Sequence, residues 1–118
     1  MTCIFVFGSN LAGVHGAGAA REANARWGAV YGQGVGHFGN SYAIPTKDRN
    51  ICTMPVEAIA PYVRDFVEYA AAHPEHSFLV TAIGCGLAGH SPADIAPLFA
   101  GSTENVFLSE KLVSALRG

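Results

Sequence analysis

Two glycine-rich segments, residues 8–18 and 84–89, hold most of the groups that could bind a ligand. Glycines near the N-terminus of a helix let backbone N–H groups approach an anion, and the helix dipole adds about half a positive charge there. A diphosphate suits such an arrangement. The candidate ligand-binding residues in these segments are Gly8, Ser9, Asn10, Gly13, His15, Gly16, Ala17, Gly18, Gly84, Cys85, Gly86 and Leu87.

Neither segment carries a standard nucleotide-binding motif. No Gly-Lys-Ser/Thr follows residues 13–18, which excludes a P-loop, and Arg21 stands where a Rossmann fingerprint needs its third glycine. Residues 34–39 match GxGxxG, but they precede a predicted strand instead of a helix. For either segment alone, turns or close helix–sheet packing would explain the glycines equally well.

Cys85 lies between two glycines, where loop amides could lower the pKa of its thiol and make it a nucleophile. The sequence specifies no histidine with an orienting Asn or Asp beside it, so packing as a small apolar residue is the favoured interpretation. His15, His37 and His90 also fall in glycine-rich loops, yet their spacing matches no metal-ligand pattern. We therefore predict no metal site, and we expect these histidines to hydrogen-bond to ligand or backbone.

Strand and helix patterns alternate along the chain. The predicted strands are residues 3–7, 41–44, 77–83 and 105–108, and the predicted helices are 16–27, 53–73, a helix capped by Ser91, and 110–116. Gly8-Ser9-Asn10 is expected to form a turn after the first, central strand, and Pro45 is expected to end the second. His73 and His76 are given a structural role at the end of the long helix.

This alternation predicts one α/β domain over residues 1–118, with a mostly parallel sheet flanked by helices. Ligands of such sheets bind beyond the carboxyl ends of the strands. The two glycine-rich segments follow the strands at 3–7 and 77–83. If these strands are neighbours, both segments face one crevice, and this convergence favours a binding site over two unrelated turns.

Three blocks of the sequence resemble the macrodomain family, in the branch that contains the terminal ADP-ribose protein glycohydrolase. They are residues 16–30, Ile44-Pro45-Thr46-Lys47 and Ile83-Gly84-Cys85-Gly86-Leu87, and the last is the most specific. Their order and approximate spacing agree with that branch over most of residues 8–99. The whole chain is also similar to small bacteriophage proteins, a likeness that carries no chemistry.

The resemblance implies a three-layer macrodomain-like fold and adds Thr46 and Lys47 to the candidate site. It implies that the first and third blocks wrap the diphosphate and distal ribose of ADP-ribose, while Lys47 matches a catalytic lysine that attacks the ribose. The aspartate that assists this lysine in the glycohydrolase is replaced by Ala88. Asp48, Asp94 or His90 are the alternatives for the lost group. Because half of the pair is missing, binding is favoured over turnover.

Composition limits the partners. The net charge is −2, so the sequence lacks the basic patch that binding of polymeric nucleic acid would need. Charged residues make up only 14% of the chain, which is too few to cover the surface of a monomer and predicts a homo-oligomer. The apolar runs are too short to span a membrane. Three cysteines without a CxxC pair fit a reducing cytoplasm better than a disulfide framework.

The sequence thus predicts binding of ADP-ribose or a related NAD-derived nucleotide, with no cofactor. Asn10 is expected to hydrogen-bond a ribose hydroxyl, and Tyr31, Phe38 and Tyr42 are candidates to stack on the adenine. One alternative is an ADP-ribosyl glycohydrolase that uses Lys47. A second alternative, from another class, is a non-enzymatic interaction module of phage type whose glycines are only structural.

Overall fold

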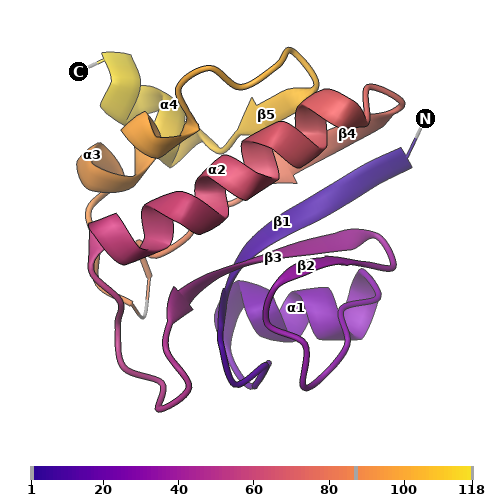
Figure 1. Cartoon of the computed structure of the whole chain (residues 1–118), viewed down its shortest axis with the longest axis vertical. Coiled ribbons are helices and arrows are strands. Elements are labelled where there is room, and N and C mark those ends of the chain that lie inside the picture. The colour runs from indigo at the N-terminus through magenta and orange to yellow at the C-terminus, as the bar shows by residue number, and fades with distance from the viewer. Residues whose placement is uncertain (1, 87, 118) are drawn as a thin grey trace.

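The apolar run at the start of the chain forms the central strand of a five-stranded sheet, as predicted (Figure 1). This computed structural model describes residues 2–86 and 88–117. The strand order is β2-β3-β1-β4-β5, and only the edge strand β2 runs antiparallel to its neighbour. The strands are β1 (Thr2–Asn10), β2 (Gly36–Phe38), β3 (Ser41–Lys47), β4 (His76–Val80) and β5 (Val106–Leu108).

Helices cover both faces of the sheet. They are α1 (Gly18–Arg26), α2 (Val56–Ala72), α3 (Pro92–Ile95), the 3₁₀ segment η1 (Ala96–Phe99) and α4 (Glu110–Arg117). Alternate residues of β1 serve the two faces, because Ile4 and Val6 belong to the large core formed with α2 and the C-terminal helices, whereas Phe7 packs with Ala20 and Ala23 of α1. Among the described residues, no helix has the length and apolar character needed to cross a membrane.

Three strand ends differ from the prediction. Gly8-Ser9-Asn10 is not a turn but the last part of β1, since Gly8 pairs with Ile44 and Ser9 with Pro45 on β3. Pro45 does not end β3, because β2 pairs with that strand only as far as Ala43 and the missing N–H breaks no ladder there. In contrast, β4 ends at Val80, and Ile83 N–H already turns back to the Thr81 carbonyl at 2.7 Å.

The helices follow the prediction more closely. Helix α2 begins after Pro55 and continues through Pro61 without a break. Ser91 caps α3, with its hydroxyl oxygen 3.2 Å from Asp94 N, as expected. Gly28 follows α1 with a φ of +80°, the left-handed conformation that suits glycine after a helix.

β1 and β4 are parallel neighbours, so the predicted convergence of the two glycine-rich segments is confirmed.

The glycines of residues 32–39 hold a loop against the end of β1. The Ser9 hydroxyl donates to the Gly34 carbonyl, and a Cβ at Gly34 would lie 1.9 Å from the Asn10 carbonyl oxygen. Such an approach is possible only without a side chain. Gly34 therefore fixes the position of Ser9 and Asn10, which the site below requires.

We expect Gly34→Ala to lower the free energy of unfolding by on the order of 3 kcal/mol, because the loop must move away from β1. Gly16→Ala is the matched control, since the nearest atom to its added Cβ is 4.0 Å away, and its effect should stay within about 0.5 kcal/mol. Urea unfolding of both variants measures the difference. Equal losses in the two would show that the contact at Gly34 does not hold the loop.

Candidate functional site

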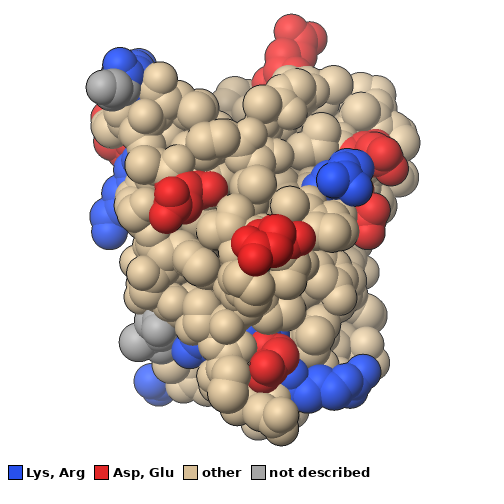
Figure 2. All heavy atoms as spheres, turned by 60° about the vertical axis from the view of Figure 1, so that its left-hand side comes forward, with Lys and Arg blue, Asp and Glu red and all other residues tan. Residues whose placement is uncertain are grey.

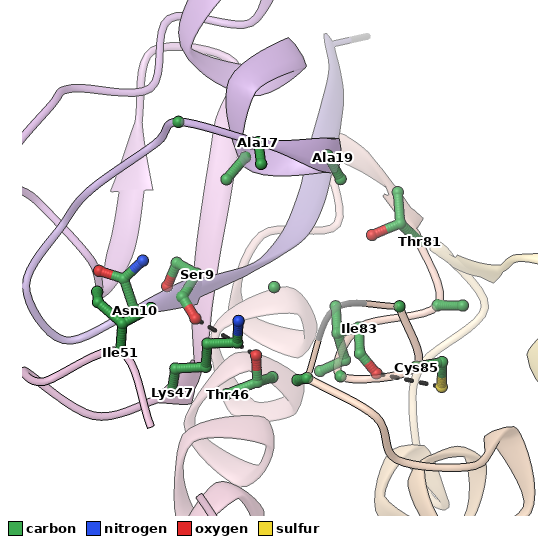
Figure 3. A pocket seen from close by; sticks show the side chains of 18 of the residues that line it. Ser9, Asn10, Ala17, Ala19, Thr46, Lys47, Ile51, Thr81, Ile83 and Cys85 are labelled. Carbon is green, nitrogen blue, oxygen red and sulfur yellow. Dashed lines mark hydrogen bonds between the residues drawn. The ribbon is translucent and has the colours of Figure 1, made fainter. Parts of the chain in front are cut away.

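A cavity of about 580 Å³ lies beyond the carboxyl ends of β1, β3 and β4 (Figure 3). This position and size are typical of small-molecule sites in parallel α/β sheets. The sequence-predicted residues that line it are Gly8, Ser9, Asn10, Gly16, Ala17, Gly18, Thr46, Lys47, Gly84, Cys85 and Gly86. Segments far apart in the sequence thus meet around one cavity.

Gly13 and His15 do not line the cavity, so their predicted ligand contact is not supported by their position. Gly13 adopts a φ of +72° and packs directly on Gly32, whose N–H donates to its carbonyl at 2.8 Å. His15 is 4% exposed, its Nε2 lies 3.0 Å from the Val30 carbonyl oxygen, and its ring meets Phe7 edge-on. Both residues therefore support the loop on the side away from the cavity. Leu87, the remaining candidate, lies outside the described residues.

The side chain of Asn10 closes the loop that follows β1 by bonding to the backbone of Val14. Its Nδ2 donates to the Val14 carbonyl at 2.8 Å, and its Oδ1 accepts from the Val14 N–H at 3.0 Å. The predicted bond from Asn10 to a ribose hydroxyl would compete with this pair. We therefore assign Asn10 the role of closing the loop that carries Gly16 to Gly18.

The start of α1 forms one wall of the cavity. Ala17 is the N-cap residue but offers no side-chain hydrogen bond, and the first turn contains no acidic residue. The first amides of a helix lack partners within the helix, and here Gly18, Ala19 and Ala20 line the cavity. In Figure 3, Ala17 and Ala19 lie across the cavity from Thr46 and Lys47. This wall is suited to an anion, because its donors and its dipole are uncompensated.

Lys47 is held firmly at the end of β3. Its carbonyl accepts from the Leu11 N–H at 2.9 Å, and the residue bridges Thr53 on its other side. The neighbouring Thr46 hydroxyl donates to the Ser9 carbonyl at 3.3 Å, which joins β3 to β1 at the cavity wall. The backbone under the lysine is thus fixed, while its side chain extends to the cavity.

The cavity wall is positively charged. Besides Lys47, Lys111 of α4 lines it, and none of the lining residues within 2–86 and 88–117 is acidic. Asp48 turns away into its own loop, where its Oδ1 accepts from the N–H groups of Asn50 and Cys52 at 2.8 and 3.0 Å. Neither Asp48, Asp94 nor His90 lines the cavity, and His90 Nε2 is instead 2.7 Å from the Met54 carbonyl oxygen.

Sequence reasoning missed several lining residues. Lys111 carried no signal, because nothing in its helix shows where that helix docks. Thr81, Ala82 and Ile83 were placed inside a strand, although they follow β4 and turn along the cavity. Ala88 lines the wall near them, tied through its carbonyl to the Thr53 hydroxyl at 2.9 Å. Val14 and Ile51 complete this group, whereas Ala19 and Ala20 also line the cavity but lie within the first block of the resemblance.

The candidate adenine-stacking residues do not reach the cavity. Tyr31, Phe38 and Tyr42 are absent from the described lining, and Tyr42 belongs to the core, where it packs against Phe66. The large apolar side chains that do line the cavity include Ile51 and Ile83. Ile51 has a φ of +62°, an unusual conformation for a β-branched residue.

Cys85 lines the cavity as a half-buried thiol. Burial raises its pKa, the positive charge of Lys111 partly lowers it, and Asp94 raises it again, with burial the largest effect. Its Sγ contacts the Ile83 carbonyl oxygen at 3.4 Å. A thiol with a raised pKa is a poor nucleophile at neutral pH, which agrees with the packing role predicted from the sequence. All three cysteines are free.

We expect iodoacetamide to modify Cys85 more slowly than Cys3 and Cys52 at pH 8, because Cys3 and Cys52 are exposed, whereas Cys85 is half-buried and burial raises the pKa of its thiol. Lys111→Met should slow Cys85 further, since it removes the charge that lowers the thiol pKa. Peptide mass spectrometry over time gives the three rates in one sample. Faster modification of Cys85 than of both exposed thiols would indicate an activated nucleophile.

Comparison with known proteins adds no precedent for this cavity. No protein-family model, no curated protein and no solved structure matches the chain.

Proposed function

We propose that the cavity binds ADP-ribose or a related NAD-derived nucleotide, with the diphosphate against the start of α1. The observation that carries this proposal is the pairing of an uncapped helix start with two lysines, Lys47 and Lys111, around a cavity whose described wall has no acidic residue. Two negative phosphates match that environment, whereas a cation or a neutral sugar would not.

The resemblance to macrodomains supports the same ligand. Its three blocks, residues 16–30, 44–47 and 83–87, are separated along the chain, and described residues of each line one cavity. In the proposed binding mode, residues 16–20 and 84–86 contact the diphosphate through their backbone. Lys47 lies near the distal ribose, and Lys111 adds a positive charge from the far end of the chain.

Binding is favoured over hydrolysis. A lysine nucleophile at the ribose needs a partner that moves a proton. Ala88 lines the cavity where the resemblance would place an aspartate, and the described wall offers no other carboxylate. Hydrolysis through Lys47 therefore remains the alternative, and release of ADP-ribose from a modified peptide, lost in Lys47→Ala, would establish it.

We further propose that the chain self-associates, because its sparse charge leaves much of the surface uncharged. The three free cysteines fit a reducing compartment. Lys, Arg, Asp and Glu are scattered over a largely uncharged surface (Figure 2). Leu79 and Phe107, 38% and 52% exposed, are register partners on β4 and β5 and form an apolar pair outside the cavity. This pair is the feature that an interaction module would use if no nucleotide binds.

Thermal unfolding with ADP-ribose, NAD, ADP and AMP tests the proposal. A ligand at 100 times its Kd adds about 2.7 kcal/mol, which raises the Tm of a domain of this size by several degrees. We expect the largest rise with ADP-ribose. If none of the four ligands at millimolar concentration shifts the Tm, nucleotide binding is wrong and the interaction-module alternative leads.

The two lysines should contribute unequally to affinity. We expect Lys47→Ala to weaken ADP-ribose binding about 10- to 100-fold and the more exposed Lys111→Ala about 5-fold, since a charged hydrogen bond is worth more where water is excluded. Arg49→Ala and Arg117→Ala are matched controls, because Arg49 follows Lys47 by two residues, Arg117 lies on the same helix as Lys111, and neither lines the cavity. Calorimetric titration that ranks the controls with the lysines would contradict this assignment.

A further inference from the structure

A second cluster of polar side chains lies near the amino ends of the strands, opposite to the cavity. His73 and Glu75 occupy the turn after α2, and His76 begins β4, beside Thr2 at the start of β1. The cavity lies beyond the carboxyl ends of these strands, so this cluster belongs to a different part of the surface. The proposed nucleotide function makes no use of it.

The three side chains lie close together. His73 Nδ1 is 3.1 Å from Glu75 Oε2, and His76 Nε2 is 3.7 Å from the same oxygen. One ligand atom from each residue lies within 4.8 Å of the other two. A tetrahedral Zn²⁺ with bonds of about 2.0–2.1 Å needs its ligand atoms about 3.4 Å apart. Both separations from Glu75 are within a few tenths of an ångström of that value.

The backbone of the turn is held in place. Asn105 Nδ2 donates to the carbonyls of Ala70, His73 and His76 at 3.0, 3.1 and 3.1 Å. One side chain thus joins the end of α2, the turn and the start of β4. The two histidines are therefore fixed relative to each other before any ion arrives, which lowers the conformational cost of binding.

The imidazole rings are also held by packing. His73 stacks on Tyr69 with ring centroids 4.2 Å apart, and His76 meets Phe78 edge-on. The two imidazoles are nearly parallel, with an interplanar angle of 18°. Glu75 is 60% exposed, so an ion from solvent can reach the point where the three ligand atoms meet.

We propose that His73 Nδ1, Glu75 Oε2 and His76 Nε2 bind a divalent transition-metal ion of the zinc class, with water at the fourth position. Two imidazoles and one carboxylate favour such an ion over Ca²⁺ or Mg²⁺, which prefer oxygen ligands. The His76 Nδ1 atom is buried and has no hydrogen-bond partner among the described residues, so this ligand has no outer support. We therefore expect a micromolar rather than a nanomolar Kd.

Titration of the full chain with Zn²⁺ alone tests the site. We expect one ion per chain and a rise in Tm of roughly 10 °C at 100 times the Kd. Glu75→Gln, at an exposed position that should not affect folding, is expected to weaken binding at least tenfold. Glu57→Gln is the matched control, since it removes an exposed carboxylate from the first turn of α2, at the other end of that helix from the cluster, and should leave the Kd unchanged.

The exposed thiols of Cys3 and Cys52 are the competing ligands, and Co²⁺ distinguishes them. Binding by two histidines and a carboxylate gives visible bands without a thiolate charge-transfer band in the near ultraviolet. Our assignment is overturned by a thiolate band, by an equal Kd in wild type and Glu75→Gln, or by no binding at millimolar Zn²⁺. A Kd weakened only in Glu75→Gln, without a thiolate band, supports it.

Discussion

The parallel pairing of β1 with both β3 and β4 is the constraint on which the rest of this structure depends. It places the carboxyl ends of three strands side by side, and everything that leaves those ends must share the same space. The loop to α1, the Thr46-Lys47 segment and the loop after β4 therefore meet without needing long-range contacts of their own. The apolar core fixes this pairing, because Ile4, Val6 and Ile44 are completely buried beneath α2.

The glycines of this protein serve two different purposes. At Gly34 and Gly13 a side chain would collide with backbone, so these positions let loops pack against each other. At Gly18 and Gly86 an added Cβ would meet nothing within 4 Å, and both line the cavity. Gly34 and Gly13 thus allow close packing of the loops that support the wall, whereas Gly18 and Gly86 leave space in the cavity. Glycine content alone therefore does not identify a binding site.

The sequence predicted the parts that local patterns determine. The apolar run at 3–7 marked the central strand, the spacing of Ile59, Val63 and Phe66 marked α2, and Ser91 marked the cap of α3, because each depends on residues close in sequence. It did not place Lys111, since the contacts that dock α4 are formed by distant residues. It ended β3 too early at Pro45, because the position of β2 decides whether a proline is tolerated there. It assigned His15 to a ligand, although the buried ring packs on Phe7.

The presence of Lys111 on the cavity wall has a consequence for how the molecule moves. The other described residues of the wall lie between positions 8 and 88, while Lys111 belongs to α4. Leu112 is the one described residue of α4 that is fully buried. Short helices with few buried residues open locally more often than central strands do. If a ligand binds as proposed and contacts Lys111, it loses that contact each time α4 opens, which couples the lifetime of the complex to the local opening of α4.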